Sequence, residues 1–135
     1  MNEFNHATIE EFRANGGKVG GPFEGAPVLL LSTIGAKSGE QRTTPVMYLA
    51  DGERMVIFAS KAGAPTNPAW YHNLLANATA TVEVGTETVE VDAVVTAGEE
   101  RDRLYSRQAG LYPQFAEYAQ RTTRQIPVIA LERRD

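Results

Sequence analysis

Two segments that alternate apolar and polar residues on either side of Gly85 constrain the fold more than any other feature. Residues 79–84 read TATVEV and residues 88–97 read TVEVDAVVTA. Alternation with a period of two is typical of strands that have one face on a core and the other in water. A glycine between two such segments indicates a turn. The pattern therefore predicts a β-hairpin with one face in solvent.

Four further segments are expected to be strands. The second and third of them are separated by turn residues, which predicts another hairpin. Pro45 in the second segment indicates an edge strand or a bulge, because proline cannot donate a hydrogen bond to a neighbouring strand. The segments are PVLLLSTIG at 27–35, RTTPVMYLA at 42–50, RMVIFAS at 54–60 and PVIALER at 127–133.

Capping-box spacing marks two helix starts. Thr8 with Glu11 predicts a helix over residues 8–15, which a pair of glycines would end. Thr96 with Glu99 repeats the spacing and opens a long helical region that a proline interrupts. Helices are therefore expected near the N-terminus and before the last strand.

A third, short helix is expected from Asn67 to about residue 77, with Asn67 as N-cap and Pro68 at the first helical position. The chain has 135 residues, enough for one domain with one core. Antiparallel strands with helices in the connections predict an α+β domain built on a small barrel or a strongly curved sheet. No GxGxxG motif follows a strand, so the sequence does not support a Rossmann fold.

Composition and charge exclude several classes of function. The formal net charge is −4, which argues against a nucleic-acid-binding protein. The chain has no cysteine, so thiolate metal sites are excluded and a cytoplasmic location is expected. The only histidines are His6 and His72, without HExxH spacing, and no metal site is expected. No signal peptide is visible and no apolar run is long enough to cross a bilayer.

The stretch GAKSGEQRTTP at residues 35–45 is the first candidate for binding chemistry. Glycines bracket Lys37 and Ser38, and Arg42 follows on the next strand. A turn of this composition can direct backbone N–H groups and two cations at a phosphate or a carboxylate. The alternative is an exposed hairpin turn that is basic by chance. It is not a Walker A loop, because that motif needs a glycine directly before the lysine.

The stretch ASKAGAPTNPAWYHNL at residues 59–74 is the second candidate. Ser60 and Lys61 leave the end of a strand, and a helix start follows within a few residues. Helix N-termini attract anions, so Lys61 and the helix start could bind one anionic group together. Trp70 either packs in the core or forms a wall of such a site.

Aromatic residues of the C-terminal helical region form the third candidate. Tyr105, Tyr112, Phe115 and Tyr118 recur at intervals that can share one helical face. They are either a core stripe or the aromatic wall of a pocket for a flat ligand. Together the three stretches suit a ligand with an anionic tail and a flat aromatic head, such as a nucleotide-like or flavin-like cofactor.

The segments GAKSGEQRTTPVMYL, FASKAGAPTNPAWYHNL and GLYPQFAEYAQRTTRQIPVIALE closely resemble the deazaflavin (coenzyme F-420)-dependent nitroreductase family of actinobacteria, the A-type branch of these oxidoreductases. The resemblance extends from about Gly21 to Leu131. It implies a split β-barrel, mainly antiparallel and related to the FMN-binding pyridoxamine-phosphate oxidases. The expected organisation is an N-terminal helical segment at 1–20 and a deazaflavin-binding barrel at 21–135.

The resemblance also implies site residues. Ser60, Tyr112 and Tyr118 would be catalytic, and Phe115 would lie in the substrate pocket, where the family often has a tyrosine. The phenylalanine therefore removes a hydroxyl from the substrate face. The implied cofactor-binding residues are Lys37, Ser38, Gly39, Glu40, Gln41, Arg42, Ala59, Ser60, Lys61, Ala69, Trp70, Tyr71, His72 and Asn73.

The implied activity is hydride transfer from reduced coenzyme F-420 to a flat organic acceptor: a quinone, an enone, an unsaturated lactone or a nitroaromatic. Two alternatives stay open. One is an FMN-dependent oxidase or reductase on the same barrel, and the other is a non-catalytic cofactor-binding protein. The expected partners are a small-molecule acceptor and at most a peripheral membrane surface, with no nucleic acid. The expected state is a monomer or a homodimer.

Overall fold

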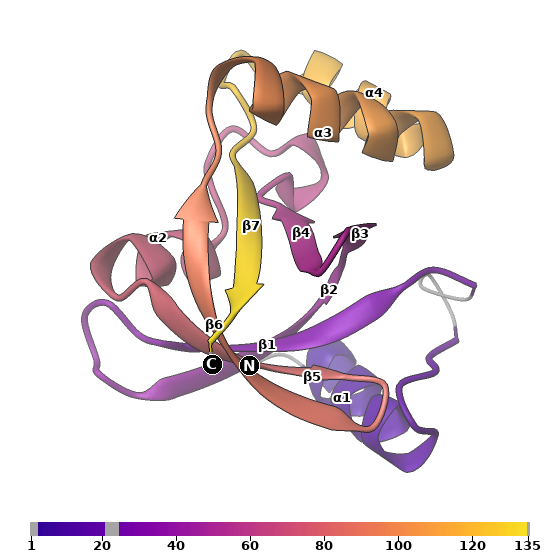
Figure 1. Ribbon diagram of the computed structural model, residues 1–135, viewed down its shortest axis with the longest axis vertical. Coiled ribbons are helices and arrows are strands. Elements are labelled where there is room, and N and C mark those ends of the chain that lie inside the picture. The colour runs from indigo at the N-terminus through magenta and orange to yellow at the C-terminus, as the bar shows by residue number, and fades with distance from the viewer. Residues whose placement is uncertain (1–2, 21–24, 135) are drawn as a thin grey trace.

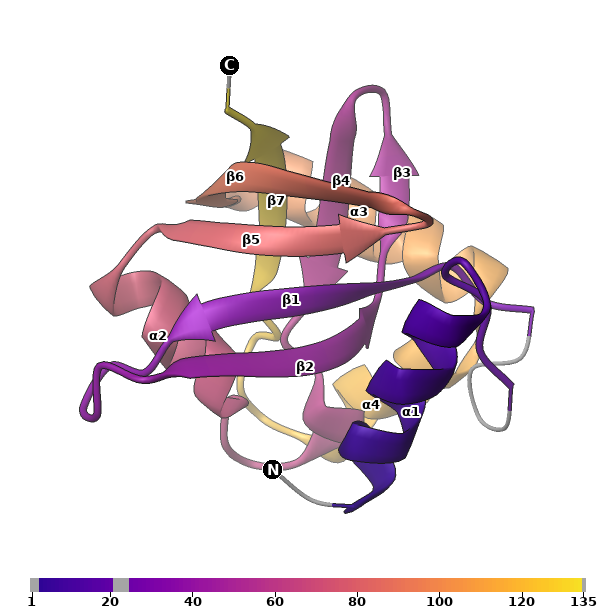
Figure 2. The same cartoon turned by 90° about the horizontal axis from the view of Figure 1, so that it is seen from below.

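One antiparallel sheet organises the part of the chain that the structure describes, residues 3–20 and 25–134 of a computed structural model. Its strand order is β2-β1-β5-β6-β7-β4-β3. The sheet curls on itself, so that β1, β2 and β5 run across β3, β4 and β7 (Figures 1 and 2). This is the strongly curved sheet that the strand pattern predicts and the split barrel that the family resemblance implies. The strands are β1 (Val28–Ile34), β2 (Gln41–Met47), β3 (Leu49–Asp51), β4 (Arg54–Phe58), β5 (Thr79–Val84), β6 (Glu87–Val95) and β7 (Val128–Arg133).

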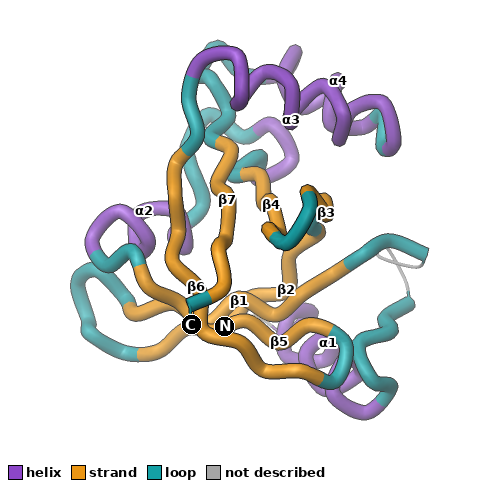
Figure 3. Tube along the Cα trace, viewed as in Figure 1, coloured by secondary structure: helices purple, strands orange, loops and turns teal. Residues whose placement is uncertain are grey.

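Helices lie around the sheet and in its connections (Figure 3). One lies against the β1–β2 side, a second follows β4, and a pair covers the far end of β4 and β7 (Figure 1). The elements are α1 (Glu3–Ala14), the 3-10 turn η2 (Lys61–Gly63), α2 (Ala69–Ala76), α3 (Gly98–Leu111) and α4 (Gln114–Arg121).

The hairpin around Gly85 is confirmed, and so is the edge position of Pro45. β5 and β6 pair from Thr79↔Asp92 to Val84↔Glu87. β2 is the terminal strand of the sheet and pairs only with β1 within the described residues. Pro45 therefore occupies a strand with one open edge, as the missing N–H of proline requires.

Three apolar clusters form the core. The first lies inside the barrel and includes Leu29, Ile57 and Trp70. The second joins β4 to α3 and α4, and the third joins α1 to β1. β1 is buried from Val28 to Thr33 because its two faces pack in different clusters. Leu29 belongs to the first cluster and Leu30 to the third. Burial on both faces explains why this strand is continuously apolar.

The strand expected at residues 42–50 is two strands. β2 ends at Met47, and Tyr48 donates its N–H to the carbonyl of Pro27. β3 then pairs with β4 rather than β1. The expected hairpin across residues 50–53 is therefore made by β3 and β4 alone. The break is where the chain passes from one layer of the curled sheet to the other, which local periodicity does not reveal.

Both expected capping boxes are wrong. α1 begins at Glu3, so Thr8 lies within the helix. The N-cap of α3 is Ala97, and the hydroxyl of Thr96 instead donates to the carbonyl of Val128 at 2.8 Å. A buried tertiary partner on β7 has replaced the local hydrogen bond that the spacing suggested.

The expected N-cap of the middle helix is also wrong. Pro68 is the N-cap of α2, and no side chain caps the helix among the described residues. The Asn67 side-chain oxygen accepts a hydrogen bond from Arg124 at 2.7 Å. As in the case of Thr96, the polar side chain forms a hydrogen bond with a residue distant in sequence and not with the start of the helix.

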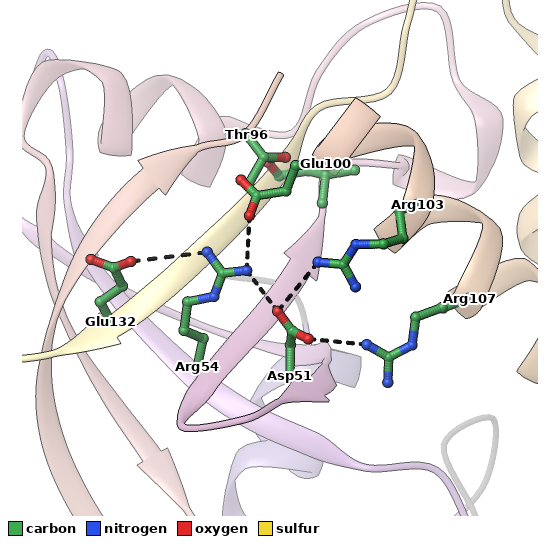
Figure 4. Close-up of polar contacts among 8 residues, drawn as sticks. Asp51, Arg54, Thr96, Glu100, Arg103, Arg107 and Glu132 are labelled. Carbon is green, nitrogen blue, oxygen red and sulfur yellow. Dashed lines mark hydrogen bonds and ion pairs between the residues drawn. The ribbon is translucent and has the colours of Figure 1, made fainter. Parts of the chain in front are cut away.

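An ion-pair network attaches α3 to the β3–β4 hairpin (Figure 4). The Asp51 carboxylate lies 2.6 Å from Arg54, 3.1 Å from Arg107 and 3.8 Å from Arg103. Arg54 also pairs with Glu100 at 3.1 Å. The hydrogen bond from Arg54 is the main reason that the pKa of Asp51 is lowered from its ordinary value.

Asp51→Asn is expected to lower the free energy of unfolding at neutral pH by about 1–2 kcal/mol, because it removes the shared anion of three arginines. The folded-state pKa is depressed, so this stabilisation is present above the unfolded pKa of about 3.9 and is lost as pH falls through the folded value. Urea unfolding of both proteins between pH 7 and pH 3 measures this. The exposed Asp92→Asn change is the control, and a stability difference between the two proteins that does not begin to shrink below about pH 4 would contradict the assignment.

Candidate functional site

A groove of about 920 Å³ lies between the turn after β1, the start of β2 and the start of α2. It joins the first two stretches that the sequence singles out, although residues 46–58 separate them. Seven of its lining residues are expected cofactor contacts, namely Lys37, Ser38, Arg42, Ala69, Trp70, His72 and Asn73. The other lining residues are Thr33, Gly35, Ala36, Thr43 and Thr44.

Asn73 joins the two sides of this groove. Its side chain is buried, the oxygen accepts from the N–H of Ala36 at 2.9 Å, and the nitrogen donates to the hydroxyl of Thr33 at 3.0 Å. Asn73 sits one turn into α2, and Thr33 is the second-last residue of β1, against which α2 packs. The amide therefore fixes the glycine-rich turn relative to the helix. Among the expected site residues it is a structural link as well as part of the lining.

The backbone of the glycine-rich turn is largely occupied by its own hydrogen bonds. Gly35 donates to the carbonyl of Glu40 at 2.7 Å, and Gly39 donates to the carbonyl of Gly35 at 2.9 Å. Glu40 donates to the hydroxyl of Ser38 at 3.2 Å. Gly39 has a φ of +71°, a value that favours glycine. The expected cradle of backbone N–H groups is therefore mostly unavailable, and anion binding would depend on side chains.

The side chains that line the groove give it a positive character. Lys37 is exposed, and Arg42 pairs only with Glu40, at 3.2 Å, among the described residues. Both partners of that pair are more than half exposed, so it is weak and can exchange for another anion. No aspartate or glutamate is among the lining residues. Glu40 and Gln41, two further expected contacts, are exposed and do not line the groove.

The start of α2 supplies the other wall. Trp70 packs in the first core cluster and also lines the groove. Tyr71 is half-buried against the same cluster and does not line the groove. His72 does line it, and its ring lies 5.7 Å from the ring of Tyr71.

The end of β4 carries a second group of expected residues outside this groove. Ala59 is fully buried, Ser60 is half-buried and Lys61 is exposed. The Lys61 ammonium donates to the hydroxyl of Thr66 at 3.3 Å. Lys61 is not among the groove-lining residues, but this hydrogen bond places its ammonium near the start of α2.

The aromatic stripe is core at its centre and accessible at its edge. Phe115 is 5% exposed, and its ring is surrounded by Phe58 at 5.8 Å, Tyr105 at 6.5 Å and Tyr118 at 5.2 Å. Tyr105 is buried as well, and its hydroxyl donates to the carbonyl of Phe115. Tyr112 and Tyr118 are half-buried. In this structure, therefore, the two tyrosines and not Phe115 have an exposed part that a ligand could reach.

Packing of α4 on η2 brings the second and third groups together. An added Cβ at Gly63 would lie 2.9 Å from the carbonyl oxygen of Tyr118, so the two backbones are in close contact. Ser60 stands immediately before η2. The half-buried Ser60 and Tyr118 thus belong to segments that pack directly on one another.

Sequence reasoning missed two residues of this region, Arg124 and Gln108. Arg124 hydrogen-bonds to the loop that carries Ser60, and no local pattern predicts such a contact. Gln108 is fully buried, although its position in the aromatic stripe was a detectable signal. Its side-chain oxygen and nitrogen have no hydrogen-bond partner among the described residues.

Gln108→Met is expected to raise the free energy of unfolding by about 1–2 kcal/mol, because it replaces a desolvated amide by an apolar group of similar shape. Chemical denaturation at neutral pH measures the change. Gln120→Met, at an exposed position of α4, is the matched control and should stay within about 0.5 kcal/mol of the original protein. A loss of stability in Gln108→Met would show that the amide is hydrogen-bonded in solution.

Known proteins are similar to this chain over most of its length. The family model described as F420H(2)-dependent quinone reductase matches residues 5–133. An F420H(2)-dependent quinone reductase of Mycobacterium tuberculosis is 39% identical over 129 residues, which cover 91% of this chain and 85% of that protein. The match spans the glycine-rich turn, the α2 segment and the aromatic stripe.

Two solved structures are similar in both sequence and fold. One is described as an F420-H2 dependent reductase, with 38% identity, a TM-score of 0.72 and coverage of 78% of this chain and 94% of that one. The other is described as a domain-swapped dimer, with 34% identity, a TM-score of 0.74 and coverage of 94% and 95%. The resemblance seen in the sequence is confirmed, and the chain belongs to the F420H(2)-dependent quinone reductase family.

Proposed function

We propose that this protein is a reductase that uses reduced coenzyme F-420 to reduce a flat organic acceptor, with a quinone as the favoured acceptor. The observation that supports this most is the groove in which Lys37, Arg42 and the start of α2 converge. The named activity of the M. tuberculosis relative agrees with it. Enones, unsaturated lactones and nitroaromatics are the other acceptor classes to test.

The residues of the groove fit the tail of such a cofactor, which carries a phosphate and glutamate carboxylates. Lys37 and Arg42 are cations without a buried counter-ion, and Ser38 and Thr43 add hydroxyl donors. Charge-assisted hydrogen bonds from such groups are about twice as strong as neutral ones. The wall formed by Trp70 is apolar and suits the adjoining part of the ligand.

Bound reduced coenzyme F-420 supplies a hydride, and the protein's part is to bind, orient and exclude water. In this proposal Lys37 and Arg42 hold the anionic tail. Ser60, at the end of β4, lies at the ring end of the site. Tyr112 and Tyr118 border the space that a flat acceptor would enter, and the buried ring of Phe115 supports them from behind.

Reduction of a quinone needs one hydride and one proton. The hydride adds to the quinone and its electron pair leaves a negative oxygen, which then takes a proton from a hydroxyl group or from water. The hydroxyls of Ser60, Tyr112 and Tyr118 are the candidates, because each has no hydrogen-bond partner for its side chain among the described residues. A donated hydrogen bond would stabilise the developing charge.

A side-by-side fluorescence titration with coenzyme F-420 and with FMN, at low and at high salt, tests the proposal. We expect salt-sensitive binding of coenzyme F-420 and little binding of FMN, followed by turnover with a soluble naphthoquinone. Preference for FMN would contradict the proposal and favour a flavin enzyme. Binding without turnover of any acceptor class would favour a non-catalytic binding protein.

The state and location of the protein are also proposals. No helix in the described residues is long and apolar enough to span a membrane. We infer a cytoplasmic protein that is a monomer or a homodimer, and the similar structure described as a domain-swapped dimer supports considering the dimer. Sedimentation of the purified protein over a range of concentrations distinguishes the two states.

A further inference from the structure

Arg124, in the segment between α4 and β7, makes hydrogen bonds to a single loop at four points. Its guanidinium donates to the carbonyls of Ala59 at 3.0 Å, Ser60 at 2.8 Å and Ala64 at 3.0 Å. It also donates to the side-chain oxygen of Asn67 at 2.7 Å. The four acceptors span residues 59–67, which is all but the last residue of the connection between β4 and α2. One side chain therefore spans both ends of this loop.

The charge of Arg124 has no carboxylate partner among the described residues. Its four acceptors are neutral carbonyl and amide oxygens. Burial is the main reason that the pKa of this guanidinium is lowered from its ordinary value, although an arginine remains protonated at neutral pH. All hydrogen bonds of this half-buried guanidinium go to neutral oxygens. Its role is therefore to fix the conformation of the loop and not to form an ion pair.

The loop that Arg124 holds is conformationally demanding. Lys61 has a φ of +46°, in the left-handed region that a residue with a Cβ rarely adopts. Gly63 has a φ of +81° and packs directly on the backbone of Tyr118. Such backbone conformations persist only where the surroundings over-determine them, and they concentrate at functional sites.

We propose that Arg124 is a positioning residue of this enzyme: it holds Ser60 and Lys61 in the one arrangement that serves the ring end of the site. This inference rests on the proposed function. Arg124 contacts neither Lys37 nor Arg42, and it does not line the groove between them. Its loss should therefore impair hydride transfer more than it impairs binding of the cofactor tail.

The first test uses the protein without cofactor. Trypsin cleaves after lysine, and Lys61 is exposed and lies in the loop to which Arg124 hydrogen-bonds. In Arg124→Gln we expect cleavage after Lys61 to be at least about 10-fold faster than in the original protein, under conditions where both are folded. Arg134→Gln, at an exposed position beyond the opposite end of β7, is the control and should leave the rate unchanged. An unchanged rate in Arg124→Gln would overturn the inference.

The second test separates kcat from cofactor affinity. In Arg124→Lys, which keeps the charge but not the four-point contact, we expect kcat to fall about 10-fold while the Kd for coenzyme F-420 changes less than about threefold. Asn67→Ala, which removes one acceptor, is the milder variant that should fold in any case and show a smaller loss of kcat. Losses that only follow the folded fraction would assign Arg124 a purely structural role and overturn the inference.

The proposed function and this inference fail in different ways. Failure of the original protein to bind coenzyme F-420 would overturn the proposed function, and with it the role of Arg124 in the reaction. Normal binding and turnover in the original protein, with unchanged kcat in Arg124→Lys and Arg124→Gln, would overturn the inference alone.

Discussion

Lys37→Ala is expected to weaken binding of coenzyme F-420 by about 10- to 100-fold, the loss that a charge-assisted hydrogen bond to an anion typically carries. Lys37 lines the groove, is exposed and has no ion pair among the described residues. Its removal should leave the unfolding transition unchanged. The effect would therefore be one of affinity and not of folding.

Salt dependence distinguishes this prediction from a general loss of activity. The original protein should lose affinity for coenzyme F-420 as ionic strength rises, and Lys37→Ala should lose it less steeply, because one contact between opposite charges is gone. Arg42→Ala should behave in the same way, and it also frees Glu40. Lys18→Ala removes an exposed lysine outside the groove and is the control. Unchanged affinity in Lys37→Ala would remove this residue from the proposed site.

The sequence predicts those parts of the fold that depend on local periodicity. β1, β5, β6 and β7 follow from apolar runs or from alternation, and the edge position of Pro45 follows from its missing N–H. The helix starts do not follow, because a local cap competes with distant partners. Thr96 hydrogen-bonds to a carbonyl of β7, and Asn67 accepts a hydrogen bond from Arg124. Neither contact can be predicted from the residues next to it in the sequence.

The candidate site, like the fold, is only partly predictable from the sequence. The residue types of the glycine-rich turn and of the α2 start are readable in the sequence, and the structure places them around one groove. How they are held is not readable. Asn73 joins the turn to the helix through Ala36, and Arg124 fixes the loop before the helix. These contacts join positions that are tens of residues apart, so only the folded arrangement reveals them.

Burial is the second property that the sequence leaves open. The aromatic stripe reads equally as core or as pocket wall, because helical spacing shows which residues share a face but not what covers that face. In the folded chain Tyr105 and Phe115 are buried and Tyr118 is half-buried. Gln108 lies on the same buried side as Tyr105, where a polar residue would not be expected.

Gly63→Ala is expected to lower the free energy of unfolding by about 2–4 kcal/mol, from two causes that add. The first is the φ of +81°, which is unfavourable for alanine. The second is steric, because the added Cβ would lie 2.9 Å from both the Cβ of Arg121 and the carbonyl oxygen of Tyr118. The carbonyl oxygen belongs to the backbone, and the position of the Arg121 Cβ is fixed by the backbone. Neither atom can therefore move easily to make room for the added Cβ.

Gly52→Ala separates the two causes. Gly52 has a φ of +62°, and nothing lies within 4 Å of an added Cβ, so only the conformational cost of about 1 kcal/mol should appear. Denaturant unfolding of both variants gives the steric part as the difference. Because the clash would move α4 away from η2, kcat with a quinone should fall in Gly63→Ala and stay unchanged in Gly52→Ala. Equal destabilisation of the two variants would show that η2 and α4 are not in close contact in solution, and the proposed proximity of Ser60 to Tyr118 would then lose its structural basis.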